Sequence, residues 1–326
     1  MTAWTNFPRN LVQPETHALL RPRFSLTSDI ISFRKCRRQY GYFGQDGYVP
    51  AQAVQIFFGQ IIHQVLDRCH RHYSGLFGHP KGSMPTDQDI EDYFDEVDQA
   101  LRAHGVRPAS PIVAEQAKQV LKTFNTVEGP ALYPRVIDTE YRLESERKDF
   151  VLRGVVDVLA ADNTGEPEIW DYKGTDKPPL SSSAMRDFEW QMSVYAELYK
   201  AKAGRYPARA VLYFLNELRT KPGDPPITKP PVPAVHVVDF MREGEEADRT
   251  PTLVKQGLET FDLTAADIMV CRQTRRWDVP TGADTPDDKT CDICDIRWNC
   301  TAHPSGKYKV RMPISELGRF GTEGNG

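Results

Sequence analysis

Two aspartates and a lysine lie at spacings that suit a site for a divalent cation. Asp157 lies within a run rich in valine and leucine, and Asp171 lies two residues before Lys173 in a second, shorter run. The segment between the runs, residues 162–167, reads DNTGEP, so the sequence predicts a β-hairpin. Asp157 and Asp171 each stand seven residues from Thr164. If the turn centres there, the two carboxylates face each other and Lys173 shares the face of Asp171.

Two carboxylates that face each other in a hairpin repel each other, so their presence requires an explanation. Like charges directly opposite each other on neighbouring strands are destabilising. Hard cations such as Mg²⁺ are held by one or two carboxylates together with substrate phosphates, and they would remove the repulsion. The alternative interpretation is that both aspartates point to solvent as ordinary loop-edge residues. The pattern favours the cation site.

Composition and charge limit the possible classes of protein. The 326 residues can bury a sizeable core, as one large domain or two smaller ones. The net charge of −4 argues against nucleic-acid binding through general positive charge, but Arg34, Lys35, Arg37 and Arg38 form a local basic cluster. This cluster could equally be a solvated helix face. The N-terminus lacks the features of a signal peptide and no apolar run has the ~18 residues of a membrane span, which predicts a soluble cytoplasmic protein with no membrane partner.

The elements that must position these residues follow from apolar periodicity and turn signals. Helices are expected at 27–40, 53–73, 87–104, 111–127, 185–203 and 251–277, and strands at 135–144, 149–160, 168–173, 208–215 and 235–240. Thr27 or Ser28 should cap the first helix. Residues 1–23 should be irregular, the proline-rich segment 220–234 should be a loop, and the tail after Ile314 should be disordered.

Three closely spaced cysteines predict a second metal centre. Cys291, Cys294 and Cys300 have the spacing C-x2-C-x5-C, and a four-ligand site needs one more thiolate. Cys69 lies on an apolar helical stripe and should be buried, whereas Cys271 and Cys36 remain as candidates. The basic neighbours of Cys36 should lower the pKa of its thiol, which favours it as the fourth ligand. Spacing alone does not separate Zn²⁺ from a 4Fe–4S cluster, and disulfides are not expected in an intracellular protein.

These motifs together resemble the PD-(D/E)XK nuclease superfamily, and within it the RecB-like branch that has an iron–sulfur cluster. AddB nuclease domains and the CRISPR-associated RecB-like exonucleases belong to that branch. The similarity spans residues 25–301, and the matching residues, in chain order, are Cys36 and Tyr40, Gly59 and His63, Gly154 and Asp157, Asp171 and Lys173, Gln191 and Tyr195, and Cys291, Cys294 and Cys300. Two positions depart from the pattern, because Val156 and Arg37 stand where proline is often found. Each motif is weak alone, but six in the right order are specific.

The resemblance implies an α/β fold with a restriction-endonuclease-like core, in which helices flank a mixed sheet. A helical N-terminal region and a C-terminal cysteine segment would accompany this core. The expected organisation is one nuclease domain at 24–301, between an irregular N-terminus at 1–23 and a tail at 302–326. Within the domain we expect a helical part at 53–130, a catalytic sheet core at 135–216 and a C-terminal part with the cluster cysteines at 235–301.

The resemblance also implies roles for individual residues. Mg²⁺ or Mn²⁺ would be held by Asp157, Asp171 and His63; Lys173 would orient the attacking water; and Gln191 and Tyr195 would position the substrate or the lysine. A 4Fe–4S cluster, or alternatively a structural Zn²⁺, would be held by Cys36, Cys291, Cys294 and Cys300. His63 could instead be a satisfied core histidine, and Gln191 and Tyr195 could serve packing alone. We expect Glu140 to be an exposed strand residue outside the site.

The expected function is that of a metal-dependent DNA nuclease, an exonuclease that acts on single strands or duplex ends. Such an enzyme would serve DNA processing, repair, recombination or defence, with a helicase or a CRISPR-type integrase as partner. One alternative is a DNA-end-binding module in which catalysis is secondary or lost. Another is a zinc-stabilised structural protein in which the acidic hairpin is incidental.

Overall fold

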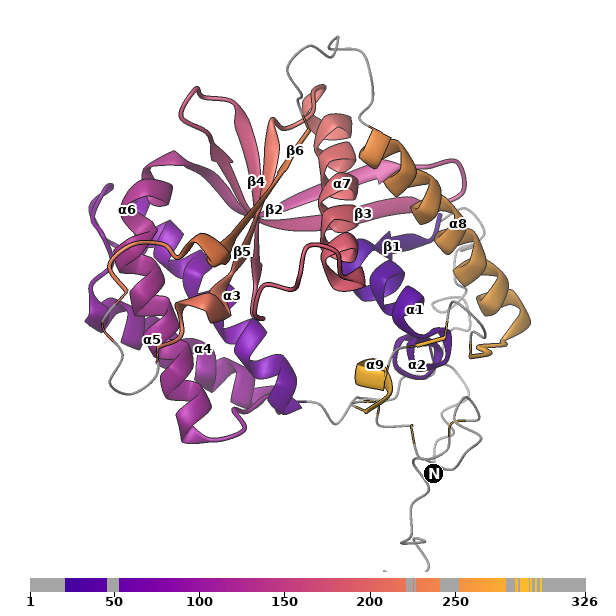
Figure 1. Cartoon of the computed structure of the whole chain (residues 1–326), viewed down its shortest axis with the longest axis horizontal. Helices are drawn as coiled ribbons and strands as arrows, with labels where there is room; N and C mark the ends of the chain where they lie inside the picture. The colour runs from indigo at the N-terminus through magenta and orange to yellow at the C-terminus, as the bar shows by residue number, and fades with distance from the viewer. Residues whose placement is uncertain are drawn as a thin grey trace, which may run out of the picture.

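One mixed β-sheet with helices on both faces forms the body of the protein (Figure 1). The computed structural model describes residues 21–45, 53–220, 225, 227–240, 252–279, 285–286, 288–292, 294, 297 and 300. Its strands are β1 (Arg23–Ser25), β2 (Val136–Glu146), β3 (Val151–Ala161), β4 (Pro167–Lys173), β5 (Arg209–Phe214) and β6 (Val235–Asp239). Its helices are α1 (Ser32–Lys35), α2 (Arg37–Tyr40), α3 (Ala53–Tyr73), α4 (Asp87–Ala103), α5 (Pro111–Val127), α6 (Gly129–Leu132), α7 (Ser183–Ala203), α8 (Thr252–Thr274) and α9 (Asp288–Asp292). The predicted fold class is confirmed.

The long helices begin and end where local chemistry allows. Thr86 and Asp89 form a capping box at the start of α4, and Ser182 accepts a hydrogen bond from Met185 N at the start of α7. Gly204 ends α7 in the left-handed conformation that glycine tolerates best. The helices and strands predicted between residues 53 and 274 are all present, with bounds that shift by three residues or fewer.

The sheet forks at the middle of β3. Strand β2 runs antiparallel along one edge of β3, from the pair Glu146–Val151 to the pair Val136–Ala160. The opposite edge is shared, because β1 pairs in parallel with residues 151–153 and β4 pairs antiparallel with residues 158–161. Residues 154–157 therefore lie between two ladders that diverge. The sheet continues from β4 through β5 to β6.

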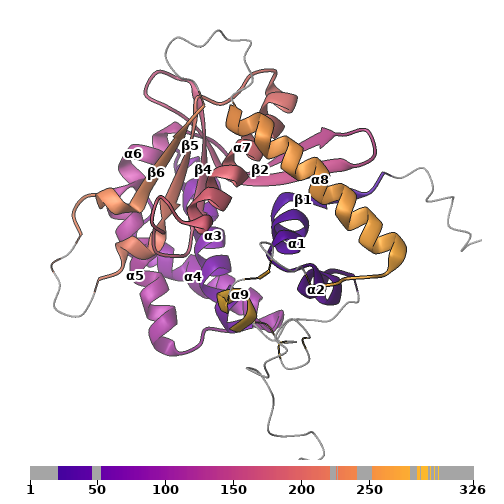
Figure 2. The same cartoon turned by 45° about the vertical axis from the view of Figure 1, so that its right-hand side comes forward.

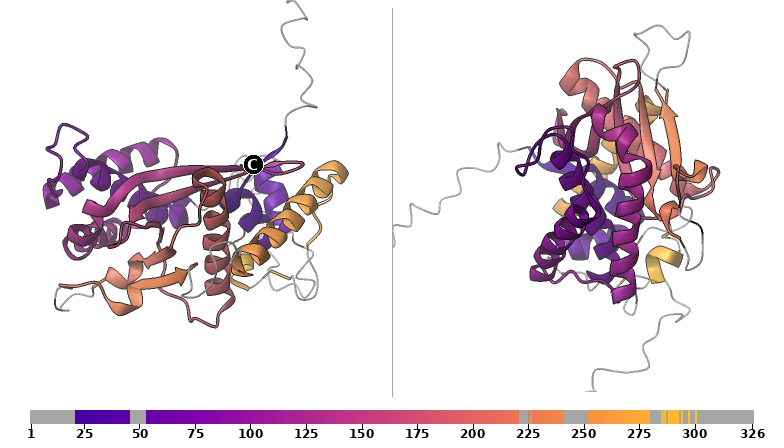
Figure 3. Two further views of the ribbon diagram at one scale, coloured as in Figure 1. Left: turned by 90° about the horizontal axis from the view of Figure 1, so that it is seen from above. Right: turned by 90° about the vertical axis from the view of Figure 1, so that its left-hand side faces the viewer.

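A separate hydrophobic core covers each face of the sheet. On one face α3, α4 and α5 pack against Val158, Trp170 and Tyr172. On the other face α7 and α8 pack against Leu152 and Val156, together with the N-terminal segment. Figure 3 shows α3, α4, α5 and α6 gathered on one side of the sheet, and Figure 2 shows α8 lying beside the segment of α1 and α2.

Strand β3 changes face at Asp157. In a regular strand, even-numbered residues share one face. Here Leu152 and Val156 lie in the core beneath α7, whereas Val158 and Ala160 lie in the core beneath α3. Glu140, which the β2–β3 register sets opposite Asp157, has a left-handed backbone with φ of 49°. The irregularity lets Asp157 turn out of the regular alternation, and such strand irregularities are common beside functional sites.

The N-terminal segment differs from the predicted single helix at 27–40. Residues Leu26–Ile31 form a π-helical turn that leads into α1, and Cys36 interrupts the helix with extended angles (φ −163°, ψ 112°) before α2. Ser25, rather than Thr27 or Ser28, accepts the capping hydrogen bond from Ser28 N. The unpredicted strand β1 begins at Arg23, the last residue of the segment that was predicted to be irregular. The tail after Ile314 lies outside the described residues.

Candidate active site

A cavity of about 690 Å³ opens at the fork of the sheet. Strands β2, β3 and β4 and helices α3 and α7 all contribute to its wall. The chemically active residues that line it are His63, Glu140, Asp157, Asp171, Lys173, Gln191 and Tyr195. The structure thus brings all the residues predicted for the cation site and its surroundings into one place.

The carboxylate of Asp157 is held by groups on both of its sides. Its Oδ1 lies 3.2 Å from His63 Nδ1, and its Oδ2 accepts a hydrogen bond from Tyr172 N at 2.7 Å. Burial disfavours the charged form, but His63 and the Tyr172 N–H outweigh it and lower the pKa of Asp157. Burial likewise disfavours the imidazolium, yet the Asp157 carboxylate raises the pKa of His63 to about 9. Asp157 is therefore a fixed anion at neutral pH.

Asp171 is the more deeply buried carboxylate of the pair, and continuing the β3–β4 register sets it opposite Asp157. Lys173 Nζ lies 2.6 Å from Asp171 Oδ2, which is an ion-pair contact without hydrogen-bond geometry. Gln191 Nε2 donates to Asp171 Oδ1 at 3.3 Å. Burial and the nearby charge of Asp157 raise the pKa of Asp171 despite the lysine. A buried oxygen without a hydrogen bond beside a second carboxylate is an arrangement that a bound cation would satisfy.

Helix α7 supplies a row of polar groups to the same cavity. Gln191 and Tyr195 are one turn apart, and Gln191 Nε2 donates to the Tyr195 hydroxyl at 3.1 Å. Gln191 Oε1 accepts from Lys173 Nζ at 2.8 Å, and the Phe188 ring lies 4.6 Å from that nitrogen. Both Gln191 and Tyr195 are buried, so packing and polar contacts fix the position of the lysine ammonium.

Gly154 makes room for this row. A Cβ at Gly154 would lie 2.7 Å from Tyr195 Cε1 and 2.9 Å from Leu198 Cδ1, closer than real side chains approach. The glycine of the G-x-x-D motif therefore has a steric role, because the absence of a side chain lets the Tyr195 ring pack against β3. On α3, by contrast, a Cβ at Gly59 would meet no described atom within 4 Å.

We expect Gly154→Ala to lower both stability and turnover. The added methyl group must displace the buried Tyr195 ring, and overpacking of this kind costs about 1–3 kcal/mol. Displacement of Tyr195 also disturbs Gln191 and, through it, Lys173. Denaturant unfolding and steady-state cleavage would measure the two effects. Gly59→Ala is the matched control, because alanine there should preserve or raise stability by up to about 1 kcal/mol. Unchanged stability of Gly154→Ala would contradict the packing role.

The donor set fits a divalent cation. Two carboxylates and one imidazole border the same cavity, and oxygen ligands suit Mg²⁺, while a nitrogen ligand shifts the preference towards Mn²⁺. Asp171 Oδ2 faces Lys173 Nζ at 2.6 Å, and Asp157 is held in its charged form. We therefore regard Asp157, Asp171 and His63 as the residues that would hold a cation, and His63 would give up its proton when the cation binds.

Sequence reasoning missed four charged residues of the cavity wall, which are Glu140, Arg142, Glu144 and Arg153. Glu140 was predicted to lie outside the site; its side chain is solvent-exposed, but it lines the cavity beside Asp157. Partial desolvation by the surrounding cavity wall and the charge of Asp157 raise the pKa of Glu140. Arg142 and Arg153 also line the cavity and add positive charge. The sequence feature that could have identified these residues is their position, because they lie on the strands β2 and β3 within four residues of Glu140 or Asp157.

The four cysteines predicted for the cluster border one small cavity of their own. Cys36, Cys291, Cys294 and Cys300 line it together with Arg38 and Arg297. Cys69 is buried against the α3–α5 core, and Cys271 packs against the core beneath α7 and α8. Burial raises the pKa of the Cys36 thiol, and it outweighs the backbone N–H groups and Arg38, which lowers the pKa as expected of a basic neighbour. The four thiols converge although 255 residues separate Cys36 from Cys291.

The basic side chains of the segment 34–38 point to different partners and do not form one patch. Arg37 forms an ion pair with Asp267 at 2.9 Å, and the Arg34 guanidinium lies 4.9 Å from the Trp190 ring. Arg38 faces the cysteine cavity. None of the four basic residues lines the cavity at the fork.

The comparison with known families decides the identity of the fold. The model of the PD-(D/E)XK nuclease superfamily matches residues 25–301 of the chain. The chain belongs to this superfamily. As in other PD-(D/E)XK nucleases, the segment Asp171–Tyr172–Lys173 has the D-x-K spacing that the name describes. The superfamily predicted from the sequence is confirmed.

Two solved structures are similar to this PD-(D/E)XK nuclease at low identity. The crystal structure of SSO0001 is 13% identical, with a TM-score of 0.29, and the match covers 84% of this chain and 96% of that chain. A proposed exonuclease from Eubacterium rectale is 12% identical, with a TM-score of 0.47 and coverage of 100% of both chains. The comparison with curated proteins gives no match. Among the described residues, no helix is both long and apolar enough to cross a membrane.

Proposed function

We propose that this nuclease is a Mg²⁺- or Mn²⁺-dependent DNA exonuclease. One observation supports the cation-dependent reaction above the others: the two carboxylates Asp157 and Asp171 share one cavity with His63 and Lys173, and Asp171 Oδ2 meets the lysine ammonium at 2.6 Å. When bound, the cation would lower the pKa of a water and neutralise charge on the phosphate. The DNA substrate and the action on ends rest on the resemblance to the RecB-like branch.

Lys173, Gln191 and Tyr195 would have separate roles beside the cation. Lys173 is a cation held by Asp171 and Gln191, so it can orient a water and stabilise negative charge that develops on the phosphate. Gln191 and Tyr195 keep the lysine in place and exclude bulk water from its side. Burial raises the pKa of Tyr195 well above its usual range, so the hydroxyl stays protonated.

The cavity wall suits a polyanionic strand. Arg142 and Arg153 lie on the β2–β3 pair along the cavity, where their guanidinium groups can contact backbone phosphates. Arginine forms bidentate hydrogen bonds with phosphate oxygens, which fixes the path of the strand without reading its sequence. Glu144 also lines the cavity and stands opposite Arg153, so the positive charge is confined to the positions of the arginines.

The cysteine cavity supports assignment to the branch with an iron–sulfur cluster. Four cysteine thiols border one space, which matches the ligand number of a 4Fe–4S cluster or of a structural Zn²⁺. We assign the cluster a structural role, because it would tie the N-terminal segment to the C-terminal segment. A helicase or integrase partner remains part of the proposal through the resemblance alone.

A degradation assay tests the proposed function. End-labelled single-stranded DNA, blunt duplex DNA, covalently closed circular DNA and RNA would be incubated with Mg²⁺, Mn²⁺ or EDTA. We expect cation-dependent loss of linear DNA from its ends while the closed circle persists. Nicking of the circle would show an endonuclease, and binding to DNA ends without cleavage by any cation would favour the end-binding module.

We expect Lys173→Ala to separate cation binding from turnover. The two carboxylates remain, so the cation should still bind, but loss of a fixed charge at the reacting phosphate should lower kcat on the order of 10²-fold or more. Calorimetric Mn²⁺ titration and single-turnover cleavage would measure the two properties. Lys118→Ala is the control, since that lysine pairs with Asp95 on the surface. Weaker cation binding with unchanged turnover at saturating cation would contradict this role.

A further inference from the structure

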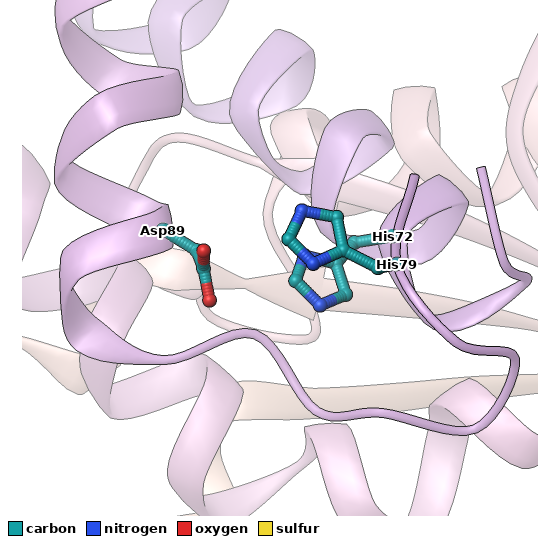
Figure 4. A group of neighbouring side chains, drawn as sticks. All are labelled: His72, His79 and Asp89. Carbon is teal, nitrogen blue, oxygen red and sulfur yellow. The ribbon is translucent and has the colours of Figure 1, made fainter. Parts of the chain in front are cut away.

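Three metal-ligating side chains converge at the connection between α3 and α4, away from both sites described above. His72 lies near the end of α3, His79 lies in the connection, and Asp89 lies in the first turn of α4. Their ligand atoms all lie within 4.8 Å of one another, and Figure 4 shows the two imidazole rings stacked, with the carboxylate on the neighbouring helix. None of the three residues lines the catalytic cavity or the cysteine cavity.

The backbone of the connection is shaped to bring His79 over His72. Gly75, Gly78 and Gly82 all have positive φ, and so does Phe77, at 59°. A left-handed conformation is uncommon for an aromatic residue, so the surrounding structure must hold it. Gly82 N donates to Tyr73 O at 2.8 Å and so closes the connection back onto the end of α3.

Polar groups orient the three side chains. The Tyr93 hydroxyl lies 2.9 Å from His72 Nδ1 and 3.4 Å from His79 Nε2. Asp89 Oδ2 accepts hydrogen bonds from Thr86 N at 2.8 Å and from Thr86 Oγ1 at 2.7 Å. A carboxylate has about four acceptor positions, so Asp89 keeps capacity for a further ligand while it caps α4.

The two imidazole rings are so close that protonation of both would be electrostatically unfavourable. Their centroids lie 3.6 Å apart with an interplanar angle of 18°, and two imidazolium ions in that stack would repel each other. His72 is 1% exposed, so the surrounding protein rather than solvent holds its ring in this stack. Neutral imidazole is the form that binds metal ions.

The geometry points to a transition-metal site of the zinc class, formed by His72, His79 and Asp89. Two imidazoles and one carboxylate suit Zn²⁺ rather than Mg²⁺ or Ca²⁺, which prefer oxygen ligands. With Zn–ligand bonds of about 2.0–2.1 Å, tetrahedral ligand atoms lie roughly 3.3–3.5 Å apart. A bound ion lies in the plane of each imidazole, so one of the two stacked rings must rotate out of the stack to close the site. The exposed side of the half-buried His79 and Asp89 leaves the fourth position to water.

A bound ion here would join the end of α3 to the start of α4. The same α3 carries His63 nine residues before His72, on the order of 13 Å along the helix axis. The site therefore adds stability to the helix that supplies a residue to the catalytic cavity, but it is independent of the nuclease reaction. An ion that binds only the folded state raises stability by mass action.

Metal content of paired variants tests the inference. Full-length protein would be treated with a chelator, dialysed against buffered Zn²⁺ and analysed for zinc, iron and protein. We expect His79→Gln to bind about one equivalent of zinc less than the wild type, since one of three protein ligands is lost. His72→Gln should behave alike, and His104→Gln, an exposed histidine beyond α4, should bind as the wild type does. His79 lies in a connection rather than a helix, so its variant should fold.

Two further measurements show whether the missing equivalent of zinc was bound by His72, His79 and Asp89. Zinc should raise the melting temperature of the wild type and of His104→Gln more than that of His79→Gln. Co²⁺ bound here should give ligand-field absorption without the sulfur charge-transfer bands that cysteine ligands produce, and His79→Gln should lose that absorption. If His79→Gln and His72→Gln bind as much zinc as His104→Gln, with the same thermal shift, the site does not exist.

Discussion

Asp171→Asn should abolish cleavage while the fold remains intact. The substitution keeps the size of the side chain but removes one of the two carboxylates that would hold the cation. A bound cation contributes several kcal/mol to stabilising the transition state, so we expect a loss of at least about 10³-fold in kcat/KM. Asp171 is buried beside Asp157, and both facts raise its pKa, so loss of its charge also removes a repulsion from the folded state.

Binding and stability measurements complete this test. Mg²⁺ or Mn²⁺ should raise the melting temperature of the wild type but not that of Asp171→Asn, because the ion binds only an intact site. The control is Asp95→Asn, an aspartate that is 63% exposed and pairs with Lys118. Cleavage by Asp171→Asn at close to the wild-type rate would show that the fork of the sheet is not the catalytic centre.

The second large effect is expected for Cys36→Ser, which should lose the proposed cluster and much of the stability. Cys36 is the one cysteine of the four that lies in the N-terminal segment, and the others lie at 291, 294 and 300. A link across 255 residues removes about 5 kcal/mol of chain entropy from the unfolded state in the loop-closure description. The purified variant should be colourless and depleted of iron and sulfide, and it should unfold at lower denaturant concentration.

Two other cysteines provide the controls. Cys271→Ser and Cys69→Ser should retain iron and sulfide, because neither residue lines the cysteine cavity. Cys69→Ser should still lose stability, since it buries a hydroxyl in an apolar core. Full iron and sulfide content in Cys36→Ser would place the fourth ligand elsewhere. A colourless wild type with stoichiometric zinc would keep the four-cysteine site and replace the cluster by Zn²⁺.

Local signals in the sequence predicted most of the fold. The hairpin turn is a clear case, because Asp162 Oδ1 accepts from the N–H groups of Thr164 and Glu166, and Gly165 has a φ of 86°. The short strand β1 was missed because three residues carry no periodicity, and it exists only through its pairing with β3. The break at Cys36 was missed because no glycine or proline marks it.

The candidate site was predictable as a set of residues but not as a geometry. Spacing around Thr164 placed Asp157 opposite Asp171, and the β3–β4 register agrees. The change of face at Asp157 and the left-handed Glu140 have no local sequence signal, because they arise where β1 and β4 part. Glu140 was therefore interpreted as a regular strand residue, and its place in the cavity wall came only from the structure.

The core beneath α7 and α8 has a consequence for protein synthesis. It joins Phe24, near the start of the described chain, to Phe261 and Ile268, near its end. Contacts between such distant residues carry a large loop-closure cost and form slowly. Ser25 and Thr27, next to Phe24, also line the catalytic cavity. A nascent chain thus lacks α8 to seal this segment until residues 252–274 have been synthesised, so the cavity is completed only after that point.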